Sequence, residues 1–342
     1  MWIYLITLNM LLLAILLPAL VLASVTGNNT LPSNLPIKVI HEFPIGTWIE
    51  NMALRPSGSV LAIDLSAPNI YEVPIDGNCE TRLVHTFTNT SGVSGIVESS
   101  PDSYLVITGN FSFAKFSAIA GTYAVHRLNF DERTDRPQVK FIGAIPTLIQ
   151  PNGILSVPET PYLLIADSIA GKVYRYNTET LDMAVYFDHP LLKPAGTSLQ
   201  AGVNGIKFSR GYFYFSNTNQ EIVARVRVSG RENTPVGDPE VVASQTLADD
   251  FIVNDYNGDI YVAENGINEL GFVSGRGNGT TPVVLAGSVN GTELAGPTAA
   301  LWARGGEGKS LLVSSTGGII GYLEGKDTVG GRISLVCVEG EC

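Results

Sequence analysis

The sequence predicts an all-β protein, a six-bladed β-propeller with four-stranded blades. Three observations point to this fold: many residues that interrupt helices, short apolar segments bounded by turn residues, and four kinds of segment that recur in the same order. The 342 residues include 36 glycines and 19 prolines, which together exceed the usual share of about 12%. Hydrophobic residues make up 45% of the chain and charged residues 15%, a composition typical of a globular protein with a large core.

Segments of the first kind begin with a small or polar residue and continue with apolar residues. They occupy residues 51–54, 95–97, 152–155, 204–206, 250–253 and 298–301. Each is followed, about ten residues later, by a second apolar strand that ends in a polar residue. These second strands are residues 60–64, 104–108, 162–167, 212–217, 259–264 and 311–315. The first segments repeat at a period of roughly 45 to 60 residues, which is the period of a propeller blade.

Two further kinds of strand complete the repeat. The third kind is found at residues 69–73, 172–176 and 222–226. The fourth kind is found at residues 82–87, 138–141, 240–242 and 282–285. Four strands per period predict one blade, and six copies predict a closed ring, whereas a two-sheet sandwich gives no reason for six copies.

The ring must close through one of the chain ends. Residues 37–43 resemble a strand of the fourth kind but precede the first copy, so they can pair into the last blade and remove two exposed edges. Residues 332–338 also resemble a strand of the fourth kind and compete for the same place. The sequence leaves open which of the two closes the ring.

The first residues predict the compartment. Residues 1–23 form an apolar run without a charged side chain, and the run ends in Val21-Leu22-Ala23. This pattern predicts a signal peptide that is cleaved after Ala23, with an uncleaved membrane anchor as the alternative. We therefore expect residues 24–342 to form one propeller domain in the secretory pathway, with no stable membrane anchor after cleavage.

Glycosylation and one disulfide agree with that compartment. Asn-x-Ser/Thr sequons occur at Asn28, Asn89, Asn110, Asn278 and Asn290. The three cysteines, Cys79, Cys337 and Cys342, permit one disulfide in an oxidising compartment, and the sequence does not choose the pairing. The formal net charge of −11 excludes a basic surface for nucleic acid, whose phosphates require clustered cations.

The repeat itself predicts where a site lies. In a propeller the first strand of every blade lines the central channel, so residues at its start and at the end of the second strand converge on one mouth. The set at the starts of the first strands is Glu50, Asn51, Ser94, Asn152, Asn204, Asp249, Asp250 and Thr298. The set at the ends of the second strands is Asp64, Asn110, Asp167, Asn217, Glu264 and Ser314. The alternative is that these polar residues are chosen for turn geometry alone.

Aromatic residues near the same segments suggest an apolar ligand. Trp48, Phe111, Phe113, Phe116, Tyr123 and Trp302 lie in or beside the segments that should form the rim, although packing between blades is the alternative for most aromatic residues here. The insertion at residues 110–122 is too long for a hairpin turn and apolar enough to need cover, so we expect a lid over the channel, with a loop packed on its own blade as the alternative.

The usual catalytic motifs are absent from the sequence. The four histidines are dispersed, which gives little support for a zinc site or a Ser/His/Asp triad. Walker, Rossmann, nucleophile-elbow and paired-cysteine zinc motifs are not found. The remaining chemistry is that of carboxyl groups, amides and an enclosed apolar space.

Several blade starts resemble those of six-bladed propellers of the senescence marker protein, gluconolactonase and regucalcin type. The motifs are WIENMALRPSG at Glu50 and Asn51, QPNGI at Asn152, LLIADS at Asp167, GVNGI at Asn204 and ADDF at Asp249. In metal-dependent lactonases of that superfamily, a Glu, an Asn and an Asp hold a divalent cation. Glu50 and Asn152 match the first two, and the Asp would fall at Asn204, Asp249 or Asp250. A neutral Asn204 weakens a site for a hard cation, so we expect no metal and no cofactor.

A closer resemblance is to secreted fungal propellers of this superfamily that accompany secondary-metabolite pathways. The shared motifs are the Ile-Glu-Asn blade start, the Ala-Asp-Ser strand end, and the Asp-Asp-Phe and Ala-Gly-Pro-Thr-Ala-Ala starts. Members of that branch resemble hetero-Diels-Alderases of tropolonic sesquiterpene (meroterpenoid) biosynthesis, which join an ortho-quinone methide to humulene without a metal. The resemblance implies a cofactor-independent hetero-Diels-Alderase, a pericyclase, that acts on small hydrophobic metabolites.

We therefore assign candidate roles to two groups of residues. The expected catalytic residues are Glu50, Asn51, Asn152, Asn204, Asp167 and Asp249. The expected substrate-binding residues are Trp48, Asn110, Phe111, Asn217, Glu264 and Trp302. The alternatives are a divalent-metal-dependent lactonase or esterase of the gluconolactonase type, and a non-catalytic ligand-binding propeller.

Overall fold

The computed structural model describes residues 33–77, 79–131, 134–196, 201–277, 279–303, 308–318, 321 and 328–339. The expected signal peptide lies outside these ranges, as do the sequons at Asn28 and Asn278, so these stay predictions. None of the helices in the described part of the chain is long and apolar enough to cross a membrane.

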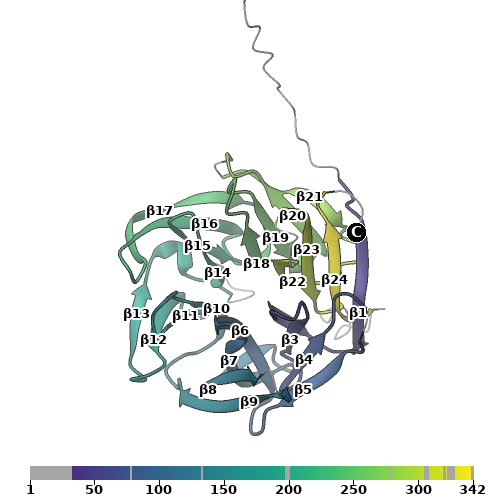
Figure 1. Ribbon diagram of the computed structural model, residues 1–342. Coiled ribbons are helices and arrows are strands. Elements are labelled where there is room, and N and C mark those ends of the chain that lie inside the picture. Colours follow the sequence, from purple (N-terminus) through teal and green to yellow (C-terminus); the bar gives the residue numbers. More distant parts are fainter. Residues whose placement is uncertain are drawn as a thin grey trace, which may run out of the picture. The chain divides into compact units, whose positions relative to one another are not determined.

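The described strands form six four-stranded antiparallel sheets in a ring, which confirms the predicted six-bladed propeller (Figure 1). The first blade consists of β2 (Ile49–Leu54), β3 (Val60–Asp64), β4 (Asn69–Val73) and β5 (Arg82–Thr86). The second consists of β6 (Gly92–Ser100), β7 (Ser103–Ser112), β8 (Ser117–Asp131) and β9 (Thr134–Ala144). The third consists of β10 (Pro151–Ser156), β11 (Tyr162–Asp167), β12 (Lys172–Asn177) and β13 (Met183–Phe187).

The other three blades follow the same order of strands. The fourth consists of β14 (Val203–Ser209), β15 (Tyr212–Asn217), β16 (Ile222–Ser229) and β17 (Thr234–Ser244). The fifth consists of β18 (Ala248–Val253), β19 (Ile260–Glu264), β20 (Glu269–Val273) and β21 (Val283–Gly287). The sixth consists of β22 (Pro297–Trp302), β23 (Ser310–Ser315), β24 (Gly330–Cys337) and β1 (Ile37–Ile45). Two short 3₁₀ helices, η1 (Pro190–Leu192) and η2 (Asn265–Ile267), lie between strands.

The two chain ends close the ring together. In the sixth blade, β1 pairs antiparallel with β24, and β24 pairs with β23. The strand near the C-terminus is therefore the third strand of its blade, and the strand near the N-terminus is the fourth. The expectation that the two compete for one place is wrong, because they occupy neighbouring places. An ion pair of 2.9 Å between Arg332 and Glu42 joins them.

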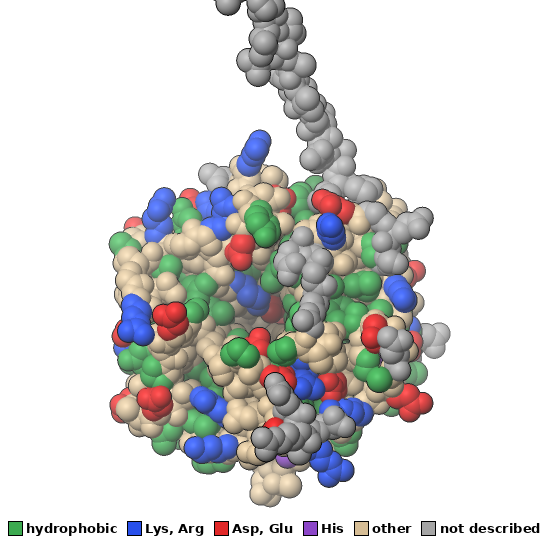
Figure 2. Space-filling model, viewed as in Figure 1, with side chains coloured by type: hydrophobic (Ala, Val, Ile, Leu, Met, Phe, Trp, Pro, Cys, Tyr) green, Lys and Arg blue, Asp and Glu red, His purple; other side chains and the backbone are tan. Residues whose placement is uncertain are grey.

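The second strands are apolar because neighbouring blades cover both of their faces. All five residues of β3 and of β19 are buried. The apolar clusters lie between blades; one of them combines Leu61 and Ile63 of the first blade with Tyr104 and Val106 of the second. The fourth strands are mostly half-buried or exposed, since they form the outer surface of the ring. On the face shown in Figure 2, Lys and Arg are interspersed with Asp and Glu rather than gathered in one basic patch.

The insertion at residues 110–122 is not a loop. The ladder between β7 and β8 continues through it, with Asn110 paired to Ile119 and Ser112 paired to Ser117. A four-residue turn that ends at Phe116, which has a positive φ of 47°, joins the two strands. The blade is therefore extended by a β-hairpin, which we call the aromatic hairpin (residues 110–122).

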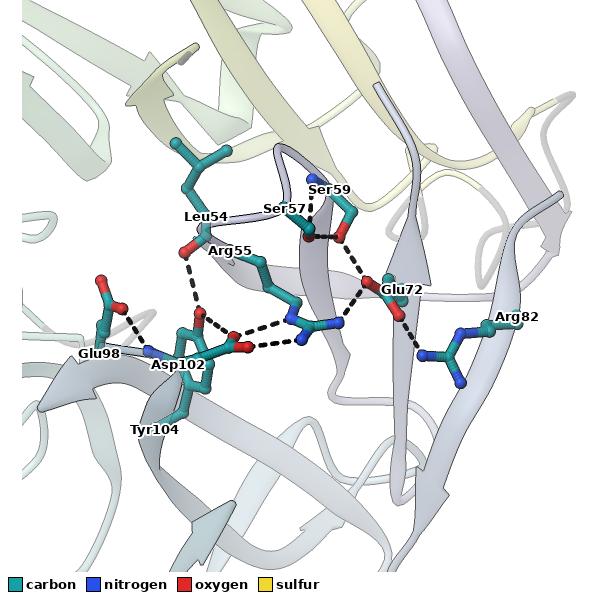
Figure 3. A network of polar contacts seen from close by, with 9 residues as sticks. All are labelled: Leu54, Arg55, Ser57, Ser59, Glu72, Arg82, Glu98, Asp102 and Tyr104. Atoms are coloured by element: carbon teal, nitrogen blue, oxygen red, sulfur yellow. Dashed lines mark hydrogen bonds and ion pairs between the residues drawn. The ribbon is translucent and has the colours of Figure 1, made fainter. Parts of the chain in front are cut away.

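Arg55 links the first two blades through a fully bonded polar network (Figure 3). Its guanidinium donates to both carboxylate oxygens of Asp102, at 2.9 and 2.6 Å, and lies 2.6 Å from Glu72. Glu72 also accepts from Arg82. The Arg55 guanidinium carbon lies 3.7 Å from the centroid of the Phe130 ring. This network holds the ends of two blades together.

The described sequons and cysteines differ in accessibility. Asn89 and Asn290 are exposed, while Asn110 is half-buried and its side-chain oxygen accepts from the Ser91 amide at 2.8 Å. Cys79 is exposed and its thiol is free, whereas Cys337 is buried. Cys342 lies outside the described residues. The glycosylation and disulfide predictions stay predictions.

Candidate functional site

Each innermost strand carries a register shift near its start. The shift falls directly after Ile49, Val93, Pro151, Val203, Ala248 and Pro297. The next residue is polar in every blade, and we call these six residues the bulge ring: Glu50, Ser94, Asn152, Asn204, Asp249 and Thr298. A bulge re-aims the side chain that it contains, and bulges are frequent beside active sites.

Five members of the bulge ring line one cavity. The cavity has a volume of about 280 Å³, and Glu50, Ser94, Asn152, Asn204 and Asp249 are among its lining residues. The volume lies near the lower end of the range for small-molecule sites. Four of the six expected catalytic residues are thus brought together: Glu50, Asn152, Asn204 and Asp249.

Aromatic side chains form the other wall of the cavity. Trp48, Phe111, Phe116 and Tyr123 line it, and three of these belong to the aromatic hairpin or the strand that continues it. The Trp48 ring centroid lies 5.8 Å from that of Phe116, and the centroids of Phe111 and Phe116 are 5.6 Å apart. Such separations are typical of interacting aromatic pairs. The hairpin therefore adds a packed aromatic surface to the cavity that the polar ring also lines.

Gly109 makes room for Tyr123 in this wall. A Cβ atom added at Gly109 would lie 2.1 Å from carbons of the Tyr123 ring. No side chain can be accommodated at that distance without moving the ring. The glycine thus leaves space for the ring at the register shift between Thr108 and Asn110, where the aromatic hairpin begins.

Two carboxyl groups of the ring have raised pKa values. Burial raises the pKa of Glu50 well above its usual range, and the nearby Asp249 raises it further. Burial raises the pKa of Asp249 to about 7, although amide hydrogen bonds oppose this. Asn204 Nδ2 donates to Asp249 Oδ1 at 2.7 Å, and Asn265 Nδ2 donates to Oδ2 at 2.9 Å. Two interacting carboxyls of this kind retain a proton near neutral pH and can act as a general acid.

Residues that follow the bulge ring along the innermost strands make a second set of polar contacts. Lys207 Nζ contacts both carboxylate oxygens of Asp250, at 2.6 and 2.7 Å. Asn51 Nδ2 donates to Asp250 at 3.3 Å and so joins the first blade to the fifth. Asn51, an expected catalytic residue, is not among the residues that line the cavity. Its amide instead takes part in this bridge between blades.

The expected residues at the ends of the second strands are turn residues. Asp167 accepts from the amides of Ile149 at 2.7 Å, Gln150 at 3.1 Å and Ala170 at 3.0 Å. Asn217 donates to the carbonyls of Leu191 and Lys193 at 2.9 and 2.8 Å. Neither residue lines the cavity.

Glu264 behaves like these two residues in part. It is buried, accepts from the Thr246 hydroxyl at 2.7 Å and is not among the lining residues. The interpretation of strand-end residues as residues that hold backbone groups, left open by the sequence, thus fits Asp167 and Asn217, whereas Glu264 bonds to a side-chain hydroxyl.

Two expected substrate-binding residues also lie off the cavity wall. Trp302 is at the end of β22 opposite to its bulge, and its ring packs against Tyr261 with centroids 5.2 Å apart. Asn110 lies at the base of the aromatic hairpin and is not among the lining residues. Trp48 and Phe111 do line the cavity, as expected.

Several lining residues were not expected from the sequence. Leu65, Thr218 and Asn265 each directly follow the residue that ends a second strand. In these three blades the prediction was therefore offset by one residue: the strand-end residue does not line the cavity, and its successor does. Gln150, Ala201 and Leu247 were also missed, and they directly precede or nearly precede an innermost strand.

The donor set does not fit a hard divalent cation. No group of three or more His, Cys, Asp or Glu side chains that could hold a metal is found among the described residues. Both oxygens of Asp249 accept from amides, and Glu50 Oε2 accepts from the Trp48 indole. The Asn204 amide that stands near Asp249 is neutral. Calcium prefers several carboxylate oxygens, so the arrangement does not favour the metal-dependent lactonase.

Comparisons with known proteins agree with the architecture. No protein-family model matches the chain. The chain is 28% identical over 319 residues to a Phoma sp protein named "Putative hetero-Diels-Alderase", with 85% of this chain and 88% of that protein covered. It is 26% identical over 319 residues to asR5 of Sarocladium schorii, which carries the same name, with 82% of this chain and 78% of that protein covered.

Solved structures show the same fold at lower identity. A luciferin-regenerating enzyme matches with a TM-score of 0.63 and 14% identity, covering 89% of this chain and 95% of that one. Regucalcin from Agrobacterium tumefaciens matches with a TM-score of 0.55 and 16% identity, covering 90% of this chain and 96% of that one.

Fold and cavity together define a six-bladed propeller with an aromatic-lined cavity, and its fold is similar to that of regucalcin. Among curated proteins, the similarity is to hetero-Diels-Alderases, which confirms the predicted resemblance.

Proposed function

We propose that this protein is a cofactor-independent hetero-Diels-Alderase that joins an ortho-quinone methide, derived from a tropolone, to an apolar alkene such as humulene. The observation that carries the proposal is the cavity, which is lined both by aromatic side chains and by a ring of amides and carboxyls. The similarity to the two curated proteins supports the reaction class.

The first step is the loss of water from a hydroxymethyl precursor. A protonated carboxyl donates its proton to the leaving hydroxyl, the C–O bond breaks, and the ring hydroxyl of the precursor returns a proton to the carboxylate, so that one water leaves and the carboxyl is restored. Glu50 and Asp249 suit this role because their raised pKa values favour the protonated form. Asp167 does not suit it, because it does not line the cavity and its carboxylate holds backbone amides.

The second step is the cycloaddition. The oxygen and the methylene carbon of the quinone methide bond to the two alkene carbons, so that two σ bonds replace two π bonds and no atom is lost. Holding both partners in contact supplies most of the acceleration, because well-oriented reactants gain effective molarities of about 10⁵–10⁸ M. Trp48, Phe111 and Phe116 provide an apolar surface for the alkene, and donors on the bulge ring can polarise the carbonyl.

A product assay tests this proposal. Purified protein is incubated with a hydroxymethyl tropolone and humulene, and the adducts are separated by chiral chromatography and mass spectrometry. We expect faster formation and a different ratio of stereoisomers than in buffer. Phe141→Ala is a matched control, since Phe141 is 58% exposed on β9 and does not line the cavity.

Three results would contradict parts of the proposal. The same rate and product ratio as in buffer would refute catalysis. Saturable binding without a rate change would favour a carrier propeller instead. Activity abolished by a chelator and restored by calcium or zinc would refute cofactor independence and favour the lactonase-type site.

We also propose that the chain enters the secretory pathway and that its signal peptide is cleaved after Ala23. The apolar residues 1–23 and the sequons support this. Mass spectrometry of the protein expressed in a fungal host checks it: we expect a mature chain that begins at Ser24, glycans on sequon asparagines and one disulfide. An intact N-terminus in a cytosolic fraction would refute the proposal.

A further inference from the structure

One hydroxyl on the cavity wall has no hydrogen-bond partner. Ser94 is 6% exposed and lines the cavity at the start of β6. Its Oγ atom is buried and has no partner among the described residues. Buried hydroxyls in native proteins are nearly always hydrogen-bonded, so each exception requires an explanation.

The equivalent position in the sixth blade shows what a structural hydroxyl looks like. Thr298 occupies the same place in the bulge ring and does not line the cavity. Its hydroxyl donates to the Ile49 carbonyl at 2.7 Å and lies 2.8 Å from Ser314 Oγ. Within the bulge ring, the Thr298 hydroxyl is therefore hydrogen-bonded between two blades, whereas the Ser94 hydroxyl beside the cavity has no partner among the described residues.

Asn152, the next member of the ring, lies beside Ser94. A Cβ atom added at Gly95 would lie 3.0 Å from the Asn152 backbone oxygen, so the two blade starts are in close contact. The Asn152 side chain is half-buried and lines the cavity. No hydrogen bond of its side-chain amide is found within the described part of the chain. In contrast, Asn204 in the following blade donates to Asp249 and Thr218.

We propose that the starts of the second and third blades form the oxygen subsite of the ligand, where Ser94 Oγ donates a hydrogen bond to a ligand oxygen and the Asn152 amide supports it. A serine hydroxyl needs only rotation about χ1 to turn toward a ligand in the cavity. Phe111 and Tyr123 line the same cavity and provide contacts for a planar ring. The ligand class is therefore a planar conjugated ketone rather than a pure hydrocarbon.

This inference rests on the proposed function for the identity of that oxygen. In a hetero-Diels-Alder reaction it is the carbonyl oxygen of the heterodiene, whose polarisation lowers the barrier. The alkene partner has no oxygen and would not use the subsite. Ser94 would then distinguish the two substrates by hydrogen bonding.

A binding experiment tests the subsite separately from catalysis. Tropolone is the probe, and cycloheptatriene is the matched ring without oxygen; their binding to the full-length mature protein is measured by quenching of tryptophan fluorescence. The variants are Ser94→Ala and Ser315→Ala. Ser315 Oγ is also buried without a partner in the described structure but does not line the cavity, so it controls for loss of a buried hydroxyl.

We expect Ser94→Ala to weaken tropolone binding by about three- to tenfold, the usual effect of one neutral hydrogen bond, and to leave cycloheptatriene binding unchanged. Ser315→Ala should change neither. Unchanged tropolone binding in Ser94→Ala, or no binding by the wild type, would overturn the subsite even if the wild type accelerates the cycloaddition. Ser94-dependent tropolone binding without any acceleration would instead sustain the subsite and refute the proposed function.

Discussion

The two polar clusters of this propeller differ in how completely they are paired. Around Arg55, every charged group has a partner: the guanidinium contacts Glu72 and Asp102, and Glu72 also accepts from Arg82 (Figure 3). Around the bulge ring, the Ser94 hydroxyl is unpaired and two carboxyls hold raised pKa values. The first arrangement is typical of a structural clamp, and the second of a site that awaits a ligand.

The larger of two hollows in this propeller is not the one that we propose as the functional site. The groove beside Arg55 has a volume of about 720 Å³, against about 280 Å³ for the cavity at the bulge ring. The larger groove contains the paired charges of the Arg55 network, and the smaller cavity is lined by aromatic rings and by the unpaired Ser94 hydroxyl. Pairing is therefore a better guide to function here than volume.

The largest effect is expected from breaking the clamp. Arg55→Ala leaves the half-buried Asp102 without its cation and the buried Glu72 with Arg82 alone, which should lower the free energy of unfolding by about 3–5 kcal/mol. Lys172→Ala is the control, because its pair with Asp188 lies at the surface, where an ion pair contributes little to stability. Chemical denaturation measures both. Equal, small effects would show that the clamp is not structural.

The next largest effect concerns the carboxyls of the bulge ring. Asp249→Asn and Glu50→Gln remove the proton donors while retaining similar shapes, so the rate of water loss from the precursor should fall by about 10²–10⁴-fold. The folded state should persist, as circular dichroism can verify. If both variants keep the wild-type rate, the dehydration step does not use these groups.

The raised pKa of Asp249 also predicts a pH dependence of stability. Its folded-state value of about 7 exceeds the ordinary 3.8, so the native state holds its proton to higher pH than the unfolded chain. The free energy of unfolding should therefore decrease as pH rises from about 4 to about 7 and level off above that. Denaturation midpoints at pH 5 and pH 8 check this. Asp249→Asn should show a smaller difference between the two, and an equal difference would contradict the assignment.

The smallest effect is expected from the aromatic wall. Phe111→Ala removes part of the apolar surface but leaves the polar ring intact, so the apparent affinity for the alkene should drop by about tenfold, roughly 1.4 kcal/mol. Saturation kinetics with humulene as the varied substrate measure this change. An equal loss in Phe141→Ala would indicate a general effect on stability rather than a role of the wall.

The sequence was sufficient to predict the fold and half of the site. The recurring blade starts placed Glu50, Asn152, Asn204 and Asp249 around one channel, because the repeat fixes which strand lies innermost. It could not show that Asp167, Asn217 and Glu264 do not line the cavity, since an acidic or amide side chain can serve a ligand or a turn equally well. Only the register shifts reveal which side chain each bulge re-aims.

The hairpin and the closure of the ring were beyond sequence reasoning for a different reason. Residues 110–122 contain no strong alternation, yet they continue a ladder that the blade has already started. Residues 37–43 and 332–338 look alike as strands, and only the pairing of β1 with β24 assigns their order. Both features depend on contacts between segments rather than on local pattern.

The pairing of β1 with β24 has a consequence for biosynthesis. The first strand to leave the ribosome belongs to the last blade, so its partner does not exist until nearly the whole chain has been made. Contacts between residues far apart in the sequence form slowly, and a strand edge that is still unpaired is prone to aggregation. We therefore expect a newly made chain to depend on chaperones until its final strands arrive, and a truncation before Gly330 to leave five completed blades without a ring.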